Sequence, residues 1–415
     1  MNLKNSILIL AGGGPAPGIN TVIGTVGKCF LSRGYRVIGM HGGYKGLFTP
    51  DPKLSELDFA TVDAIFNNGG SFLRMSRYKP SDEDFQERFN LKLFRDNNIK
   101  LLVTIGGDDT ASTANRVTNF LKSHDYHISN IHVPKTIDND LPLPMRTPTF
   151  GFNSAMAEGT RIAATIYEDA RTSGNWFLVS SMGRSSGSLA IHIGASSHYP
   201  MIIIPEMFDK STITLDKIIR LTISSIIKRR IMGLDYGAVI ISEGVFHTLS
   251  TEEIEKSGVR FTTDEHGHIE LGKVSKAQLF NNILETYKER LGLNVSTRPV
   301  DIGYEFRCQT PVAYDLFYCT QLGCGVYELY RQGYTGCIVY VDPVGQTKPI
   351  YLHQLQDPRT GRIMPRLVDI NSAYAQNIFR QMLNFITEDD YEAASKWLRN
   401  PEEYDFYKIL NWKRK

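Results

Sequence analysis

The chain has 415 residues, of which 42% are hydrophobic and 22% are charged, and its formal net charge is +2. A chain of this length predicts two lobes or domains, each with its own apolar core. The charge gives no broad basic surface for nucleic acid, and no apolar run approaches the roughly 20 residues that cross a bilayer. The N-terminal apolar stretch ends in a glycine turn without a cleavage pattern, so we expect a cytoplasmic protein with no membrane partner.

Short apolar runs typical of strands alternate along the chain with amphipathic stretches of helical type. The runs are 7–10, 36–40, 101–105, 131–134, 176–181, 201–205, 237–242 and 336–341. Helical patterns such as 20–34 and 214–231 lie between them. Strands that are apolar on both faces need helices on both sides. The pattern therefore predicts an α/β fold of two lobes, each a mostly parallel sheet sandwiched by helices.

Five of these predicted strands are followed directly by a glycine-rich or charged turn. The turns are "AGGGPAPGIN" (11–20), "GGDDT" (106–110), "KTIDND" (135–140), "MGRSSG" (182–187) and the turn that Glu243 opens. Ligands of open parallel sheets bind at the carboxyl ends of the strands. The turns therefore predict one active site, in a cleft between the two lobes.

The cysteines form an odd set of five without a CxxC pair: Cys29, Cys308, Cys319, Cys324 and Cys337. This argues against a disulfide framework and against a zinc site. We expect the five to be small core side chains in a reducing compartment.

The first glycine turn satisfies neither of two common phosphate-binding patterns. A dinucleotide fingerprint needs glycine where Pro17 stands, and a Walker A loop needs Lys and Ser or Thr where Ile19 and Asn20 stand. Glycines that let the backbone approach a phosphate, followed by a helix starting near Asn20, still suit an anion. A purely structural tight turn is the alternative.

The second turn places two carboxylates, Asp108 and Asp109, where a phosphate would lie. A carboxylate beside a phosphate is repelled unless a cation lies between them, so Asp108 is interpreted as a magnesium ligand. The alternative is that the aspartates cap a helix that starts near Ala111. For Thr110 the cap is the favoured interpretation.

The third turn packs several charges into a short loop after a strand. Lys135 supplies a point charge for phosphate and Thr136 a hydroxyl group. Either Asp138 or Asp140 could accept a proton from an attacking alcohol. A turn of Asx type would explain Asn139 without any chemistry.

The remaining polar residues suit a phosphorylated sugar. Arg184 and Glu243 follow strands, and the alternating segment "STRPVDIGYEFR" adds Arg298, Tyr304 and Arg307. Arginine makes forked contacts with phosphate, while glutamate and tyrosine suit sugar hydroxyls. Taken singly, each residue is more often part of a surface ion pair.

The motifs "GGGPAPGIN", "GGDDT", "PKTIDND", "MGRSSG" and "R…GYEFR", in this order, resemble those of the phosphofructokinase family from about residue 7 to about residue 345. The resemblance implies magnesium-dependent transfer of a phosphoryl group to the 1-hydroxyl of fructose 6-phosphate, in glycolysis, by a homodimer or homotetramer. In tetrameric bacterial members a neighbouring subunit supplies an arginine just before the "MGR" strand, where this chain has Asn175. The inter-subunit contact therefore stays open.

The resemblance also assigns roles to matching positions. It implies that Asp138 is the base and Asp108 the metal-associated carboxylate. The catalytic residues implied are Asp138, Lys135, Asp109 and Arg77, and the donor-binding residues are Gly13, Asp109, Thr110 and Lys135. The sugar-phosphate contacts implied are Thr136, Ile137, Asp138, Met182, Gly183, Arg184, Glu243, Arg298, Tyr304 and Arg307.

The donor is predicted from two positions. ATP-using members have glycine where this chain has Asp109 and Lys135, and the pyrophosphate-using branch resembles this sequence at both. A carboxylate at position 109 would repel the α-phosphate of a nucleotide, and a lysine at 135 would attract compact diphosphate. The sequence therefore predicts a reversible, pyrophosphate-dependent enzyme. An ATP-dependent or mixed-donor enzyme and a non-catalytic regulatory subunit are the alternatives.

The predicted lobes follow from these roles. Residues 1–150 with about 306–355 would form the phosphoryl-donor lobe. Residues about 151–305 with about 356–415 would form the sugar-phosphate lobe, which includes C-terminal helices packed by their aromatic residues. The segment past residue 355 matches no family motif.

Overall fold

The computed structural model describes residues 4–209, 213–255, 274–360 and 363–414, and within these ranges the chain forms two compact units. The first unit consists of Met1–Ala155 and Tyr304–Arg366, and the second of Met156–Gly303 and Leu367–Lys415. Residues 356–366 were predicted with the C-terminal helices but belong to the first unit. The reason is that Arg366 hydrogen-bonds to Asn139 and Thr147 of that unit.

The first unit is built on a sheet with the strand order β11-β10-β5-β4-β1-β2-β3. Its strands are β1 (Ser6–Ala11), β2 (Arg36–Met40), β3 (Leu54–Leu57), β4 (Ile99–Gly106), β5 (Ser129–Pro134), β10 (Cys337–Val341) and β11 (Thr347–Tyr351). The strands from β10 to β2 are parallel, whereas β3 and β11 pair antiparallel at the two edges. The sequence predicted neither edge strand, because edge strands lack side chains that are buried on both faces.

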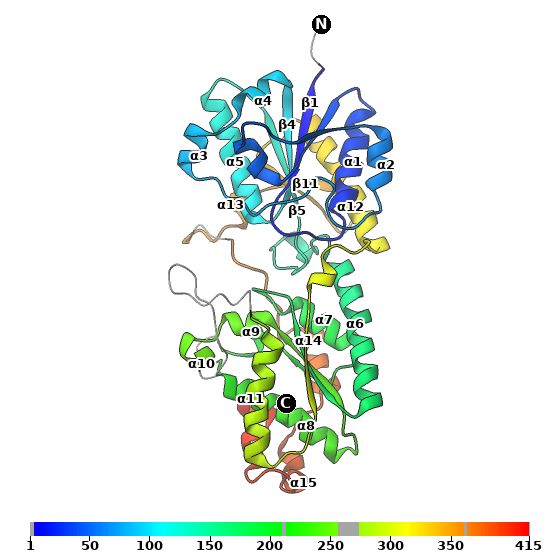
Figure 1. Ribbon diagram of the computed structural model, residues 1–415, viewed down its shortest axis with the longest axis vertical. Coiled ribbons are helices and arrows are strands. Elements are labelled where there is room, and N and C mark those ends of the chain that lie inside the picture. The colour runs from blue at the N-terminus through cyan, green and yellow to red at the C-terminus, as the bar shows by residue number, and fades with distance from the viewer. Residues whose placement is uncertain (1–3, 210–212, 256–273, 361–362, 415) are drawn as a thin grey trace. The chain divides into compact units, whose positions relative to one another are not determined.

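Helices cover both faces of this sheet. They are α1 (Ile19–Leu31), α2 (Phe59–Ile65), α3 (Asp82–Glu87), α4 (Leu91–Asp96), α5 (Asp108–Ser123), α12 (Ala313–Arg331) and α13 (Leu352–Leu355). Helices α1, α2 and α12 lie on one side of the strands, and α5 and α13 lie on the other (Figure 1). Every residue of β1 is buried between these layers, as a central parallel strand requires.

The second unit has a parallel sheet with the order β7-β8-β6-β9. Its strands are β6 (Trp176–Ser181), β7 (Met201–Ile203), β8 (Gly237–Ser242) and β9 (Thr297–Ile302). The first three were predicted as strands. β9 was noted only for its alternation, because Arg298 and Asp301 are exposed on this edge strand. The prediction of an α/β fold with two mostly parallel sheets is confirmed.

The helices of the second unit run from the core to the C-terminal segment. They are α7 (Ser188–Ser196), α8 (Leu215–Ile231), α9 (Glu243–His247), α10 (Thr251–Glu255), α11 (Lys276–Leu291), α14 (Ala373–Asn377), α15 (Tyr391–Ala394) and α16 (Phe406–Leu410). Helix α6 (Phe152–Ser173) carries the chain from the first unit into the second. The C-terminal helices are short, and aromatic packing supports them: the rings of Phe385 and Phe406 stack with centroids 4.0 Å apart.

Candidate active site

Three of the predicted turns meet at one edge of the first sheet. β5, β4 and β1 are neighbours in that order and run parallel, so their carboxyl ends lie side by side. Ala11 at the end of β1 pairs with Ile105, and Gly106 at the end of β4 pairs with Pro134. The turns that follow these strands are therefore brought together within one unit.

The glycine turn after β1 lies directly beside cationic side chains. The amide of Gly13 donates to the carbonyl oxygen of Ser76 at 2.9 Å, and Gly13 has a φ of +84°, in the left-handed region that favours glycine. A Cβ atom placed on Gly13 would lie 3.7 Å from Nζ of Lys135, and one on Gly14 would lie 3.6 Å from the guanidinium of Arg77. Helix α1 begins just beyond the turn, at Ile19, one residue before the predicted start.

Lys135 is the buried member of this cationic group. Only 8% of the residue is exposed, and burial lowers the pKa of its ammonium group to about 8. The nearby carboxylate of Asp138 raises this pKa, while the positive charges of Arg307 and Arg77 lower it. Positive charge is thus gathered around a glycine turn, an arrangement that suits a compact polyanion.

The acid pair occupies the first turn of α5. The helix begins at Asp108 with Gly107 as its N-cap, so the predicted start near Ala111 and the predicted cap by Thr110 are both wrong. Asp108 and Asp109 are exposed, and the N-terminal end of the helix dipole favours their charge. Thr110 is buried instead. A Cβ on Gly12 would lie 2.7 Å from its hydroxyl oxygen, so Thr110 packs beside the first glycine turn.

Asp109 has an ionic partner that sequence reasoning missed. Its carboxylate lies 2.6 Å from Nζ of Lys79, and about two thirds of each side chain is exposed. Exposed pairs of this kind contribute roughly 0–1 kcal/mol to stability. The pair therefore orients Asp109 more than it stabilises the fold. Lys79 lies two residues after Arg77, and this proximity was the only signal that could have pointed to it.

The loop after β5 holds its two aspartates in different surroundings. The hydroxyl group of Thr136 donates to the Asp140 carboxylate at 3.0 Å and accepts from the Asp138 amide at 3.0 Å. Burial raises the pKa of Asp140, the Thr136 hydrogen bond opposes this, and the negative charge of Asp108 adds to the rise. Asp140 is therefore engaged with Thr136 and near Asp108, whereas the charge of Asp138 acts on Lys135. Ile137, between them in sequence, is buried.

In the second unit, the turns after β6 and β8 meet in the same way. Ser181 at the end of β6 pairs with Ser242 on one side and with Ile302 on the other. The Ser242 hydroxyl donates to the carbonyl oxygen of Gly183 at 3.1 Å, and Gly183 has a φ of +132° that favours glycine. Met182, Gly183 and Arg184 thus begin beside Glu243, which opens α9.

Two further charged residues of the second unit lie near this turn and were not predicted. Nζ of Lys276 is 3.9 Å from the carboxylate of Glu243. Partial burial lowers the pKa of His247, Glu243 raises it, and the positive charges of Arg184 and Lys276 lower it further. Neither Lys276 nor His247 carries a local sequence signal, because each is placed by packing rather than by a motif.

Other predicted sugar contacts are not gathered at this turn. Arg298 is exposed near the amino end of β9 and pairs with Phe177, four residues before the Ile302 position that adjoins Ser181. At about 3.3 Å per residue, this places it about 13 Å away along the strand. Tyr304 and Arg307 belong to the first unit, where the Arg307 guanidinium lies 4.8 Å from the centroid of the Tyr304 ring.

Within the described ranges, no group of three or more His, Cys, Asp or Glu side chains is arranged to hold a metal ion. The predicted metal ligand Asp108 has Asp140 as an electrostatic neighbour. A metal here would therefore take most of its ligands from water or substrate.

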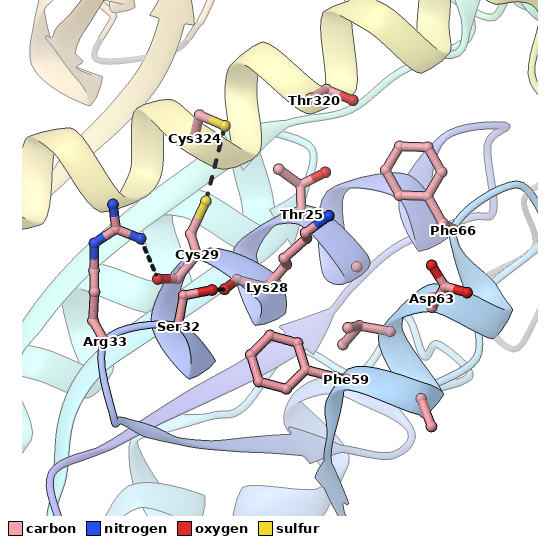
Figure 2. A pocket seen from close by; sticks show the side chains of 13 residues that line it. Thr25, Lys28, Cys29, Ser32, Arg33, Phe59, Asp63, Phe66, Thr320 and Cys324 are labelled. Atoms are coloured by element: carbon pink, nitrogen blue, oxygen red, sulfur yellow. Dashed lines mark hydrogen bonds between the residues drawn. The ribbon is translucent and has the colours of Figure 1, made fainter.

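A cavity of about 890 Å³ lies elsewhere in the first unit, and none of the predicted site residues line it. Cys29 on α1 and Cys324 on α12 face each other there with sulfur atoms 3.8 Å apart (Figure 2). The prediction that the cysteines are core residues holds for Cys319 and Cys337 but is wrong for Cys308 and Cys324, which are exposed, and for Cys29, which is half-buried. Helix faces turned to this cavity or to solvent carry them, so being small and apolar did not decide their place.

These features define an α/β protein with a cation-lined glycine turn at the carboxyl ends of neighbouring parallel strands. The chain belongs to the phosphofructokinase family, described as "Phosphofructokinase", which it matches over residues 6–330. The predicted family is thereby confirmed. Across the described ranges, every helix falls short of the length and apolar content that a bilayer span requires.

Individual proteins extend this similarity over nearly the whole chain. The pyrophosphate–fructose 6-phosphate 1-phosphotransferase of Thermotoga maritima is 35% identical over 403 residues, which cover 96% of this chain and 91% of that protein. The protein of the same name from Naegleria fowleri is 36% identical over 390 residues, covering 92% and 88%. The pyrophosphate-dependent phosphofructokinase of Marinobacter aquaeolei shares the fold with a TM-score of 0.66 at 18% identity, covering 95% and 91%.

Proposed function

We propose that the protein is a magnesium-dependent pyrophosphate–fructose 6-phosphate 1-phosphotransferase. It transfers a phosphoryl group reversibly from diphosphate to the 1-hydroxyl of fructose 6-phosphate and yields fructose 1,6-bisphosphate. The observation that carries this proposal is the buried Lys135 beside Gly13, with Arg77 and Arg307 nearby. The names of the Thermotoga and Naegleria relatives support the same substrates.

The proposed donor site belongs to the first unit. Diphosphate carries a high charge on few atoms, so it gains most from a lysine that is already desolvated and held in place. Gly13 and Gly14 let the backbone approach the phosphates without a side chain in the way. Arg77 lies against Gly14, where it would bridge the phosphate that is transferred.

Asp109 sets the choice of donor in this proposal. Its carboxylate projects from the first turn of α5, and the ion pair with Lys79 restrains it. A nucleotide would bring an additional phosphate and its negative charge toward this carboxylate, and like charges in contact cost several kcal/mol. Diphosphate ends sooner and avoids the repulsion.

Asp138 is the proposed base. It would take the proton from the 1-hydroxyl as that oxygen attacks the phosphorus of the nearer phosphate, while the bond to the leaving phosphate breaks. Asp140 is the less suitable of the two aspartates, because it already accepts the Thr136 hydroxyl hydrogen bond. In the reverse direction, Asp138 returns the proton to the sugar oxygen.

The proposed sugar-phosphate contacts draw on both units. They are Thr136, Ile137, Tyr304 and Arg307 of the first unit and Met182, Gly183, Arg184 and Glu243 of the second. Ile137 is buried and would contribute through its backbone. Arg298 is left out of the contacts that one chain makes, because of its place near the amino end of β9.

Magnesium is proposed to bind at Asp108, with Asp140 near enough for their charges to interact. One or two carboxylates are what Mg²⁺ usually takes from a protein that also binds phosphates, because it keeps its waters. Bound there, the ion would neutralise charge on diphosphate. We further propose a cytoplasmic homodimer or homotetramer, and the free cysteines fit a reducing compartment.

A donor comparison on the purified protein tests the function. With fructose 6-phosphate and Mg²⁺, we expect kcat/KM with diphosphate to exceed that with ATP by at least about 100-fold, the equivalent of about 3 kcal/mol. Equal turnover with the two donors would overturn the proposed donor. Binding of the sugar phosphate without turnover on either donor would instead favour a regulatory subunit.

Paired variants locate the selectivity. Asp109→Gly with Lys135→Gly should lower kcat/KM for diphosphate and narrow the preference over ATP, because the repelling carboxylate and the attracting ammonium are both gone. Lys92→Ala with Asp96→Ala removes an exposed ion pair on α4 and serves as the matched control. If the glycine variant still excludes ATP as the parent protein does, other residues set the donor.

A further inference from the structure

We propose that Arg366 is a positioning residue that holds the loop carrying the proposed base in its working conformation. Arg366 lies in the segment past residue 355, to which no sequence motif gave a role, and it is the last residue of the first unit. The proposal rests on the proposed function for its effect on turnover, but the contacts that carry it are independent of any substrate.

Arg366 donates hydrogen bonds to three residues of this loop. Its amide donates to the Asp140 carbonyl oxygen at 2.6 Å, and Nε donates to the Asn139 carbonyl oxygen at 3.0 Å. One terminal nitrogen donates to the Thr147 carbonyl oxygen at 2.9 Å, and the other contacts the side-chain oxygen of Asn139. The backbone and both ends of the guanidinium group are thus directed at one loop.

The loop needs such a partner at this point. Asn139 has a φ of 54°, in the left-handed region that costs non-glycine residues roughly 1–2 kcal/mol. Thr136 and Thr149 hold the start of the loop through the Thr136 hydroxyl and carbonyl groups. Beyond Thr136, the carbonyl oxygens at 139 and 140 receive their donors from Arg366.

The chemical link to the reaction is the neighbour of Asn139 in sequence. Asp138 directly precedes it, so rotation of the backbone at Asn139 would turn the proposed base away from the hydroxyl that it deprotonates. A misplacement of about 1 Å can cost about 100-fold in rate. Only arginine offers several donors in a fixed plane, so lysine cannot replace these contacts.

Steady-state kinetics separate positioning from binding. Arg366→Ala should lower kcat about 100-fold and leave KM for diphosphate within about 3-fold, because Lys135 and the arginines around Gly14 are unchanged. Arg366→Lys should recover little of the rate. Arg359→Ala is the matched control, since Arg359 lies in the same segment, pairs with Asp357 and has an 89% exposed side chain. Parent-like kcat in Arg366→Ala would overturn the proposal.

A double-variant cycle tests whether Arg366 acts through Asn139. Asn139→Gly removes the side-chain oxygen that Arg366 contacts while it permits the positive φ. If the contact matters, Arg366→Ala combined with Asn139→Gly should be no slower than Arg366→Ala alone. Fully additive losses would mean that the two residues act separately, and would contradict the proposal.

Hydrogen exchange gives a readout that needs no catalysis. Amides of residues 136–147 should exchange at least about 10-fold faster in Arg366→Ala than in the parent protein, while those of β4 stay protected. Unchanged exchange in the loop would overturn the proposal even if activity fell. If the parent protein has no diphosphate-dependent turnover, the proposed function fails, and the exchange result still decides whether Arg366 holds the loop.

Discussion

The two units prepare their candidate residues in opposite ways. In the first unit the main cation is buried: Lys135 is 8% exposed, and a loop fastened by Thr136 and Arg366 surrounds it. In the second unit Arg184 is exposed, and Glu243 is half-buried with only a long contact to Lys276. A buried charge has already lost its water and much of its freedom, whereas an exposed arginine must be ordered by the ligand.

This difference separates two kinds of specificity. The choice of donor is built into the fold of the first unit, because its charges cannot move away from a wrong ligand. Recognition of the sugar phosphate in the second unit depends on side chains that the ligand itself gathers. Substitutions in the first unit should therefore change turnover and donor choice, and those in the second should change affinity.

The largest expected effect is the loss of the base. Asp138→Asn keeps the size of the side chain but cannot accept a proton, so kcat should fall about 1000-fold, within the range for general-base catalysis. Affinity for fructose 6-phosphate, measured by equilibrium dialysis, should stay within a few-fold. Asp63→Asn, on α2 and remote from the loop, is the matched control. Loss of sugar binding in parallel with kcat would remove the contrast between the units.

A pH titration examines the buried cation. Burial lowers the pKa of Lys135 from 10.5 to about 8, so the group is charged below about pH 8 and loses its proton as the pH rises through that value. KM for diphosphate should therefore rise about 10-fold between pH 8 and pH 9, because binding requires the charged form.

Lys135→Arg provides the control for this titration, because its guanidinium keeps its charge throughout the range. The variant should show a flatter KM profile above pH 8 than the parent protein, whatever the ionisation of diphosphate itself contributes. Superimposable profiles would mean that Lys135 does not titrate at the donor site, and the first unit would lose the feature that distinguishes it.

The sequence revealed the site where chemistry follows directly after a strand. The limits predicted for 36–40, 176–181 and 237–242 agree with those of β2, β6 and β8, because apolar strands end abruptly at polar turns. The order of the strands in each sheet then decides which turns meet. That order depends on long-range pairing, which no local pattern contains.

The residues that sequence reasoning missed share one property. Lys79, Lys276 and Arg366 reach their partners across gaps of 30 or more residues, and each stands in a stretch with no motif of its own. The start of α5 was misplaced for a different reason. Asp108 was treated as part of a turn, although a helix can begin with acidic residues because its dipole favours them.

The smallest expected effect compares two arginines of the second unit. Arg184→Ala should raise KM for fructose 6-phosphate about 5-fold, a value suited to an exposed charged contact of about 1 kcal/mol. Arg298→Ala should change it less than about 2-fold, because Arg298 lies near the amino end of β9, whereas Arg184 follows the carboxyl end of β6. A rise as large as that of Arg184→Ala could not come from a contact at the "MGR" turn of the same chain. It would mean that Arg298 meets the sugar phosphate bound to another copy, and recognition by the second unit would then require an oligomer.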